Sequence, residues 1–113
     1  MASPQSYNYS MVIGDTIPDV VFRFNRGGVG FVWNLTLTPP SQPNIILSTE
    51  DNTLSASLEF VDGLPYTTVT WTVLPEQSQA IQTGSLTRYH YSSIDPDGGV
   101  QTLLKGVIAG EAR

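Results

Sequence analysis

Apolar and polar side chains alternate along most of this chain in short runs, and turn residues separate the runs. The last third has the clearest order: the run at 69–74 leads into 75–81, which begins with a proline, and two more runs follow near 86–93 and 100–109. Alternation with a period of two is typical of strands buried on one side, and proline is favoured at the first position of a helix. The last third therefore predicts a strand, a short helical turn and then two strands that form an antiparallel hairpin.

Similar runs predict four strands earlier in the chain, at residues 20–24, 33–38, 45–47 and 54–60. The segments between runs are rich in residue types that favour turns, above all glycine, proline, aspartate and asparagine. The expected turns are at 26–30, 39–43, 50–53, 62–65 and 95–99. About seven short strands separated by such turns predict an all-β fold, a sandwich or a barrel, and we favour the sandwich.

The corner before the penultimate strand favours one kind of sandwich. The expected helical turn leads to Gly84 and then to Tyr89 and Tyr91. In immunoglobulin-like domains a tyrosine at this place bonds through its hydroxyl to the corner backbone. Tyr89 is the candidate for that bond, and Tyr91 is expected to pack inward beside it. The chain has no cysteine, so we expect an immunoglobulin-like antiparallel β-sandwich of about seven strands with one short helical turn and no disulfide.

The same pattern predicts the domain organisation and the core. We expect residues 1–12 to form an extended N-terminal arm and residues 13–113 to form a single β-sandwich domain, because a chain of 113 residues is long enough to bury one core. The apolar positions of the separate strands share one phase. This phase predicts that six aromatic side chains lie inside: Phe22, Phe24, Trp33, Phe60, Trp71 and Tyr89.

Composition limits the classes of function. The formal net charge is −5, and the five lysines and arginines are scattered, which argues against a basic face for nucleic acid. Only 13% of the residues are charged. A surface of hydroxyls and amides suits a protein that stays in contact with neighbours, because these groups cost less to bury than ions. No apolar run approaches the ~20 residues of a membrane helix, and no signal peptide is visible. We therefore expect neither nucleic acid nor a membrane as a partner.

Few residues could support catalysis or hold a metal ion. His90 is the single histidine, and without cysteine it lacks the companion ligands that a metal site needs. The segment 95–99 begins like a calcium loop but lacks the later oxygen ligands, so we expect a hairpin turn there. The glycines of 27–30 precede a strand, so they cannot present a helix N-terminus to a phosphate. We expect no catalytic residue, no cofactor and no metal ion.

A sugar-binding strip is a second interpretation of the segment 88–91, where two tyrosines alternate with Arg88 and His90. Successive side chains of a strand point to opposite faces. The tyrosines therefore share one face and the basic residues share the other. This separation favours packing of Tyr89 and Tyr91 in the core over a strip that stacks on sugars.

Loose motifs along the chain occur in the same order in a known group of proteins. The motifs are Gly14-Asp15-Thr16 before the strand at 20–24, then 70–81, Gly84, Tyr89-His90-Tyr91, 95–98 and 103–106. They resemble a family of small virion proteins of tailed bacteriophages. The chain is also similar to the N-terminal domain of siphophage upper baseplate proteins, an immunoglobulin-like sandwich that anchors receptor-binding proteins.

This resemblance implies a non-enzymatic bacteriophage structural protein, a tail-fibre or baseplate adaptor that docks receptor-binding or fibre proteins onto the virion. The expected partners are other virion proteins (tail, baseplate or fibre subunits), within a homo-oligomer in the particle, after synthesis in the host cytoplasm. An extended arm can add a strand to a neighbour's sheet, so we expect the N-terminal segment and an edge strand to hold the domain in an oligomeric collar. The alternatives are a capsid decoration or cement protein and, from a different class, a carbohydrate-binding module.

Overall fold

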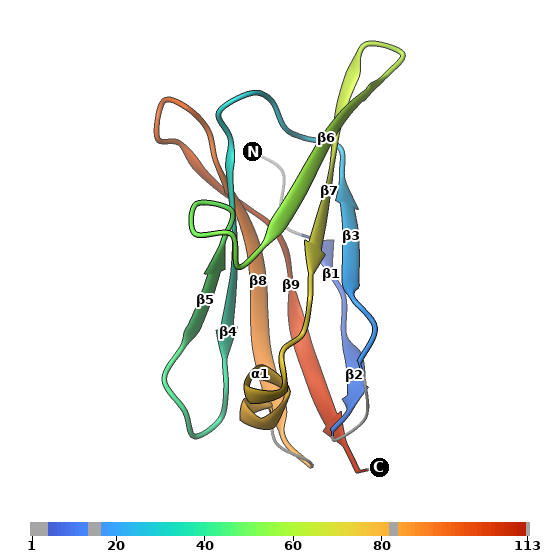
Figure 1. The fold of residues 1–113 in the computed structure, drawn as a ribbon, viewed down its shortest axis with the longest axis vertical. Coiled ribbons are helices and arrows are strands. Elements are labelled where there is room, and N and C mark those ends of the chain that lie inside the picture. The colour runs from blue at the N-terminus through green and yellow to red at the C-terminus, as the bar shows by residue number, and fades with distance from the viewer. Residues whose placement is uncertain (1–4, 14–16, 82–83, 113) are drawn as a thin grey trace.

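Two β-sheets face each other, and one short helix lies at an end of the molecule (Figure 1). The computed structural model describes residues 5–13, 17–81 and 84–112. Strands make up 56% and helix 6% of the structure. The strands are β1 (Gln5–Ser6), β2 (Tyr9–Val12), β3 (Val20–Phe24), β4 (Val32–Thr38), β5 (Ile45–Ser48), β6 (Ser55–Val61), β7 (Leu64–Trp71), β8 (Leu86–Ile94) and β9 (Val100–Glu111), and the helix is α1 (Pro75–Ala80).

The order of the strands is that of an immunoglobulin-like sandwich. The larger sheet has the order β1-β9-β8-β4-β5, with β2 also paired to β9, and the smaller sheet has the order β3-β7-β6. The smaller sheet therefore matches strands B, E and D of an immunoglobulin domain, while β4, β8 and β9 match strands C, F and G. The helix α1 connects the two sheets just before the penultimate strand, at the predicted corner.

The seven predicted strands are present as β3 to β9, and the predicted helical turn is α1. The prediction differs from the structure at the ends of β7, which begins at Leu64 and ends at Trp71, whereas the alternation predicted a strand over 69–74. The turn expected at 62–65 consists of Asp62 and Gly63 alone, because Leu64 and Pro65 already pair with β6. The structure also has two more strands, β1 and β2, and these pair parallel with β9, whereas the other strand pairs are antiparallel.

Local chemistry explains why α1 begins where it does. Pro75 occupies the first turn, where a missing N–H costs nothing. The side-chain oxygen of Gln77 accepts a hydrogen bond from the backbone N–H of Leu74 at 2.9 Å, and a second from Nε1 of Trp71, also at 2.9 Å. Gln77 thus ties the start of the helix to the end of β7 and satisfies the one polar atom of a buried indole.

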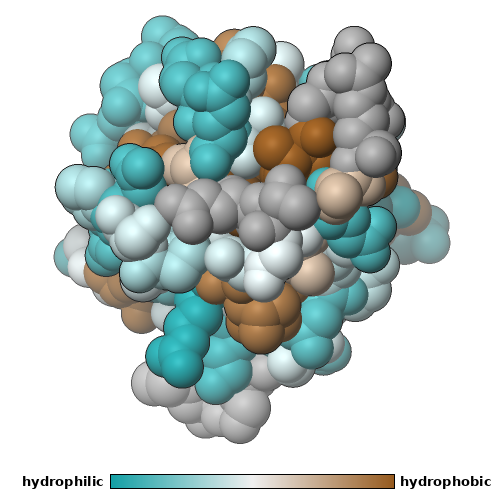
Figure 2. All heavy atoms as spheres, turned by 90° about the horizontal axis from the view of Figure 1, so that it is seen from below, coloured by the Kyte–Doolittle hydropathy of each residue, from teal (hydrophilic) through white to brown (hydrophobic). Residues whose placement is uncertain are grey.

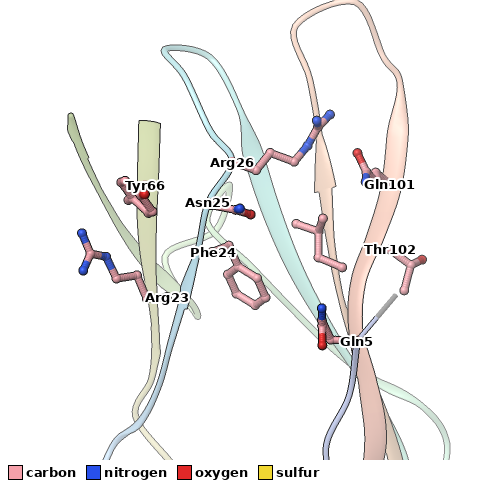
Figure 3. A pocket seen from close by; sticks show the side chains of 9 residues that line it. Gln5, Arg23, Phe24, Asn25, Arg26, Tyr66, Gln101 and Thr102 are labelled. Carbon is pink, nitrogen blue, oxygen red and sulfur yellow. The ribbon is translucent and has the colours of Figure 1, made fainter. Parts of the chain in front are cut away.

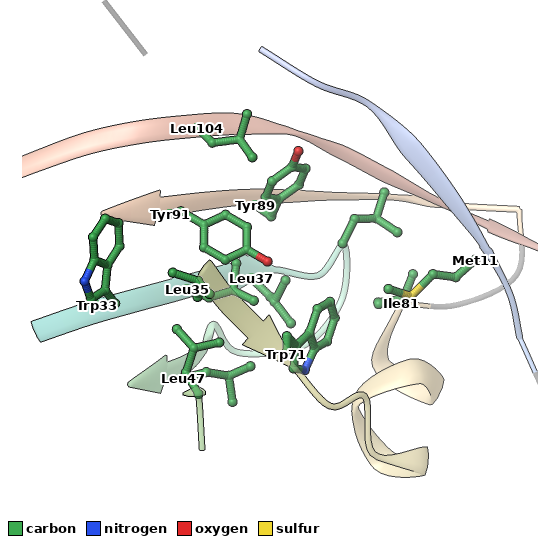
Figure 4. Packing of buried hydrophobic residues seen from close by; sticks show 13 residues of the cluster. Met11, Trp33, Leu35, Leu37, Leu47, Trp71, Ile81, Tyr89, Tyr91 and Leu104 are labelled. Atoms are coloured by element: carbon green, nitrogen blue, oxygen red, sulfur yellow. The ribbon is translucent and has the colours of Figure 1, made fainter. Parts of the chain in front are cut away.

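The core fills the space between the sheets (Figure 4). Trp33, Trp71 and Tyr89 are buried, as predicted, and Phe22 and Phe24 are partly buried against them. The ring of Phe24 stacks on Trp33 with a centroid distance of 5.2 Å. Aliphatic and aromatic side chains from six strands, the helix end and the segment before β6 complete the cluster: Met11, Leu35, Leu37, Leu47, Leu54, Val69, Ile81, Tyr91, Leu104 and Ile108.

The prediction that Phe60 lies in the core is wrong, because 64% of this residue is exposed. Its phase along β6 is the expected one. Phe60 pairs with Pro65, four residues from the pair Ala56 and Val69, so it points to the same face as the buried Val69. The β6–β7 hairpin, however, extends past the rest of the sandwich (Figure 1), and no opposing sheet covers its tip. The strand therefore presents a core-facing side chain beyond the end of the core.

The N-terminal segment lies along the edge of the larger sheet. β1 and β2 pair with β9 in one continuous register, from Gln5 opposite Leu104 to Val12 opposite Glu111. The arm that was expected to extend along a partner thus bonds over residues 5–12 to its own domain, and Met11 is buried in the core. Residues 1–4 lie outside the described residues, and strand addition to a neighbour stays a prediction.

The contact between the arm and β9 depends on a glycine. A Cβ atom at Gly106 would lie 1.9 Å from the carbonyl oxygen of Tyr7, so only glycine allows this approach. The hydroxyl of Tyr89 donates to the same carbonyl oxygen at 2.5 Å, and the backbone N–H of Val107 donates to Oδ1 of Asn8. Among the described residues, the Tyr89 hydroxyl therefore bonds to the arm and not, as expected, to the corner backbone.

Candidate functional site

Three connections gather at the end of the sandwich opposite α1: the β3–β4 loop, the β6–β7 hairpin and the β8–β9 turn (Figure 1). Each carries an exposed apolar side chain: Val29 is 89% exposed, Phe60 is 64% exposed and Val100 is 67% exposed. We call this the loop end. Figure 2 shows the other end, where hydrophobic surface lies in separate patches between hydrophilic side chains. The exposed apolar side chains make the loop end a candidate binding surface.

The β6–β7 hairpin is the most prominent part of the loop end. Asp62 and Gly63 both have positive φ, at 53° and 79°, as a two-residue type I′ turn requires. This turn twists with the strands and keeps them paired up to Val61 opposite Leu64. Val61 is 41% exposed and Leu64 is 59% exposed. The hairpin thus presents an apolar tip on a well-formed β-turn.

A groove of 480 Å³ opens beside the hairpin, between β3 of the smaller sheet and β9 of the larger sheet (Figure 3). Most of its lining side chains can donate or accept hydrogen bonds, and none of the described ones is a carboxylate. The lining residues are Gln5, Arg23, Phe24, Asn25, Arg26, Tyr66, Gln101, Thr102 and Leu103. Gln5 belongs to the arm and Tyr66 to the hairpin, so the groove joins these two features.

Both arginines of the groove are held in place. Nη2 of Arg23 lies 2.8 Å from Oε1 of Glu59, and its guanidinium lies 4.4 Å from the centroid of the Tyr66 ring. Nε of Arg26 donates to Oγ of Ser93 at 2.9 Å. Oriented guanidinium, amide and hydroxyl groups can bind peptide or carboxylate oxygens. They do not form a nucleophile with an adjacent base.

The residues that sequence analysis considered for chemistry do not come together. His90 lies on the outer face of the larger sheet, away from the groove. In the 95–99 segment, Oδ1 of Asp95 accepts from the backbone N–H groups of Asp97 and Gly99, at 3.0 and 2.8 Å. The aspartate therefore closes the predicted hairpin turn. In the part of the chain that the structure describes, no three His, Asp or Glu side chains are grouped to hold a metal ion.

The sugar-binding strip does not form, because Tyr89 and Tyr91 are buried between the sheets, as alternation predicted. Burial, together with the neighbouring Tyr7, raises the pKa of Tyr89 to about 12. Burial also holds the pKa of Tyr9 and that of Tyr91 far above the ordinary tyrosine value. These phenols remain neutral and serve packing.

Sequence analysis missed the exposed hairpin tip and the groove. The tip had a signal in the sequence, because Phe60-Val61 and Leu64-Pro65 place four apolar residues around an Asp-Gly turn. An apolar run of this kind is unusual so close to a turn. The groove had no signal, since it depends on the spacing between β3 and β9.

Comparison with protein-family models returns no match for this chain, and comparison with curated proteins returns none either. No helix among residues 5–13, 17–81 and 84–112 is long and apolar enough to cross a membrane. The assignment of a role therefore depends on the fold, the loop end and the groove.

Proposed function

We propose that this chain is a non-enzymatic structural protein of a tailed bacteriophage, an adaptor that docks a receptor-binding or fibre protein onto the tail or baseplate. The observation that carries the proposal is the apolar tip of the β6–β7 hairpin, formed by Phe60, Val61 and Leu64. Removal of such side chains from water is favourable, and exposed apolar patches of this kind mark interaction sites. The tip is suited to a pocket on a neighbouring virion protein.

The groove beside the hairpin supports a protein partner over a small ligand. Protein interfaces combine an apolar centre with a rim of hydrogen-bonding groups. Here the apolar tip is the centre, and Arg23, Asn25 and Gln101 of the groove supply polar groups beside it. Because Glu59 and Ser93 already orient the two arginines, little side-chain freedom is lost when a partner binds.

The resemblance of the segments 70–81 and 89–91 to virion proteins supplies the class of particle. A low content of charged residues, 13%, fits a protein that assembles with neighbours. The homo-oligomer in the particle belongs to the same proposal. A capsid decoration protein would use the same hairpin tip, and its location in the particle distinguishes the two roles.

The double variant F60S/L64S tests the proposal in assembling particles. We expect it to fold normally and to be lost from tails, which then lack fibres or receptor-binding proteins. The matched control is Val21→Ser, which removes an apolar side chain exposed on β3, away from the tip. Equal incorporation of both variants would refute the proposal. Loss from heads with intact tails would assign the protein to the capsid.

A further inference from the structure

The outer face of the larger sheet carries a group of basic side chains. Arg88 and His90 of β8 alternate with the buried tyrosines and so point away from the core. Lys105 of β9 lies directly opposite His90, and Arg88 lies on the diagonal from Lys105. Side chains at such positions of an antiparallel pair lie roughly 5 to 8 Å apart. The three basic side chains therefore form one compact group.

This group lines a shallow hollow of 710 Å³. The other lining groups are mostly hydroxyls, amides and backbone, and the full lining is Ser6, Asn8, Thr38, Arg88, Tyr89, His90, Thr102, Lys105, Gly106 and Val107. Among these described residues there is no carboxylate. The hollow spans strands β1, β4, β8 and β9, so the rigid sheet sets the spacing of its side chains.

The charge of the hollow contrasts with that of the whole chain. The protein has ten acidic residues against five lysines and arginines, yet two of those five and the single histidine meet here. Arg23 on the smaller sheet forms an ion pair with Glu59, whereas no described acidic residue pairs with Arg88 or Lys105. Arg88 and Lys105 carry like charges on the diagonal of the strand pair and so repel each other. A bound anion would offset this repulsion.

We propose that the hollow binds a short acidic segment of another protein, with Arg88 and Lys105 each holding a carboxylate. Alternate side chains of an extended segment are roughly 7 Å apart, which matches the diagonal separation of Arg88 and Lys105, roughly 7 to 8 Å. Arginine binds carboxylate with two parallel hydrogen bonds. The hydroxyls and amides around the group can bond to the peptide backbone.

Charge also selects a short segment over a long polyanion. The net charge of −5 repels nucleic acids and polyanionic glycans, whose charges continue beyond the hollow. A segment with two or three carboxylates contacts the basic group alone. The exposed part of the hollow also lacks an aromatic platform, because Tyr89 is buried, and so it does not suit a neutral sugar. The site does not involve the hairpin tip. The proposal therefore does not depend on which particle the protein belongs to.

The test uses the intact protein and a capped peptide, Ser-Glu-Thr-Glu-Thr-Glu-Ser, in titration calorimetry at low salt. We expect binding that the Gln counterpart of the peptide lacks. The variant R88Q/K105Q should weaken it at least about tenfold. The control N52D/Q79E lowers the net charge by the same two units at exposed positions outside the hollow and should change it less than about twofold. Thermal melts confirm that each variant is folded.

Four outcomes would overturn the proposal. Binding of the Gln peptide as tight as that of the Glu peptide would show that charge is irrelevant. An equal loss of binding in N52D/Q79E and R88Q/K105Q would show that net charge alone causes the effect. Tighter binding of heparin, used as a long polyanion, than of the peptide would favour a polyanion as the ligand. Absence of any binding by the Glu peptide would refute the site.

Discussion

β4 and β6 are both seven-residue strands with alternating apolar side chains, yet their burial is opposite. In β4, Trp33, Leu35 and Leu37 are buried, because β4 has a paired neighbour on each side and the smaller sheet across from it. β6 is an edge strand with β7 as its neighbour, and its second half belongs to the projecting hairpin. The same pattern thus builds the core in one strand and an exposed apolar surface in the other.

Alternation determines which face of the sheet a side chain occupies, but it does not determine what covers that face. Phe60 and Val69 share a face of the smaller sheet, but only Val69 has the larger sheet opposite it. Strand β7 belongs to both regions, since it runs from the exposed Leu64 to the buried Trp71. Substitutions along these strands should therefore range from severe to silent.

The largest effect is expected for Trp71→Ala at the covered end of β7. The change empties a fully buried site and leaves the side-chain oxygen of Gln77 without its indole donor. We expect the free energy of unfolding to fall by about 3–5 kcal/mol, measured by urea denaturation. A loss below about 1 kcal/mol would mean that the covered region is not the core.

An intermediate effect is expected for Tyr89→Phe, with Tyr91→Phe as its matched control two residues away. The hydroxyl of Tyr89 bonds to the carbonyl oxygen of Tyr7, whereas the buried hydroxyl of Tyr91 has no hydrogen-bond partner among the residues that the structure describes. Tyr89→Phe should cost about 1 kcal/mol of unfolding free energy, while Tyr91→Phe should be neutral or slightly stabilising. Equal losses in thermal melts would contradict the assigned bond.

The smallest effect is expected for Phe60→Ser, considered for stability alone. Since Phe60 is mostly exposed, the free energy of unfolding should change by no more than about 0.5 kcal/mol. Solubility should increase, because the apolar tip is reduced. If urea denaturation gave a loss comparable to that of Trp71→Ala, the hairpin would have to pack against the body of the protein.

Much of the fold could be predicted, because each strand of the sandwich repeats the same local rule. Pro75 and Gln77 act within one turn of chain, so α1 was visible in the sequence. Phe60 could not be placed, since its exposure depends on where the facing sheet ends. β1 and β2 were missed although Tyr7, Tyr9 and Met11 alternate with polar residues, because residues 1–12 were expected to form an extended arm that pairs with a partner.

The candidate site was less predictable than the fold. The groove depends on the distance between β3 and β9. The hollow on the outer face of the larger sheet depends on which residue of β9 lies opposite His90. Pairing register across separate strands is a long-range property. The local pattern showed that Arg88 and His90 share a face, but only the register brings Lys105 to them.

The pairing of the N-terminal arm with β9 has a consequence for folding during synthesis on the ribosome. Asn8 and Val107 are 99 residues apart in the chain, so β1 and β2 can pair with β9 only after β9 and the residues before it have been translated. Contacts between such distant residues slow folding. Until β9 emerges from the ribosome, β1 and β2 have no strand to pair with. Closure of the larger sheet is therefore a late step of folding, after which this edge of β9 is no longer open to other chains.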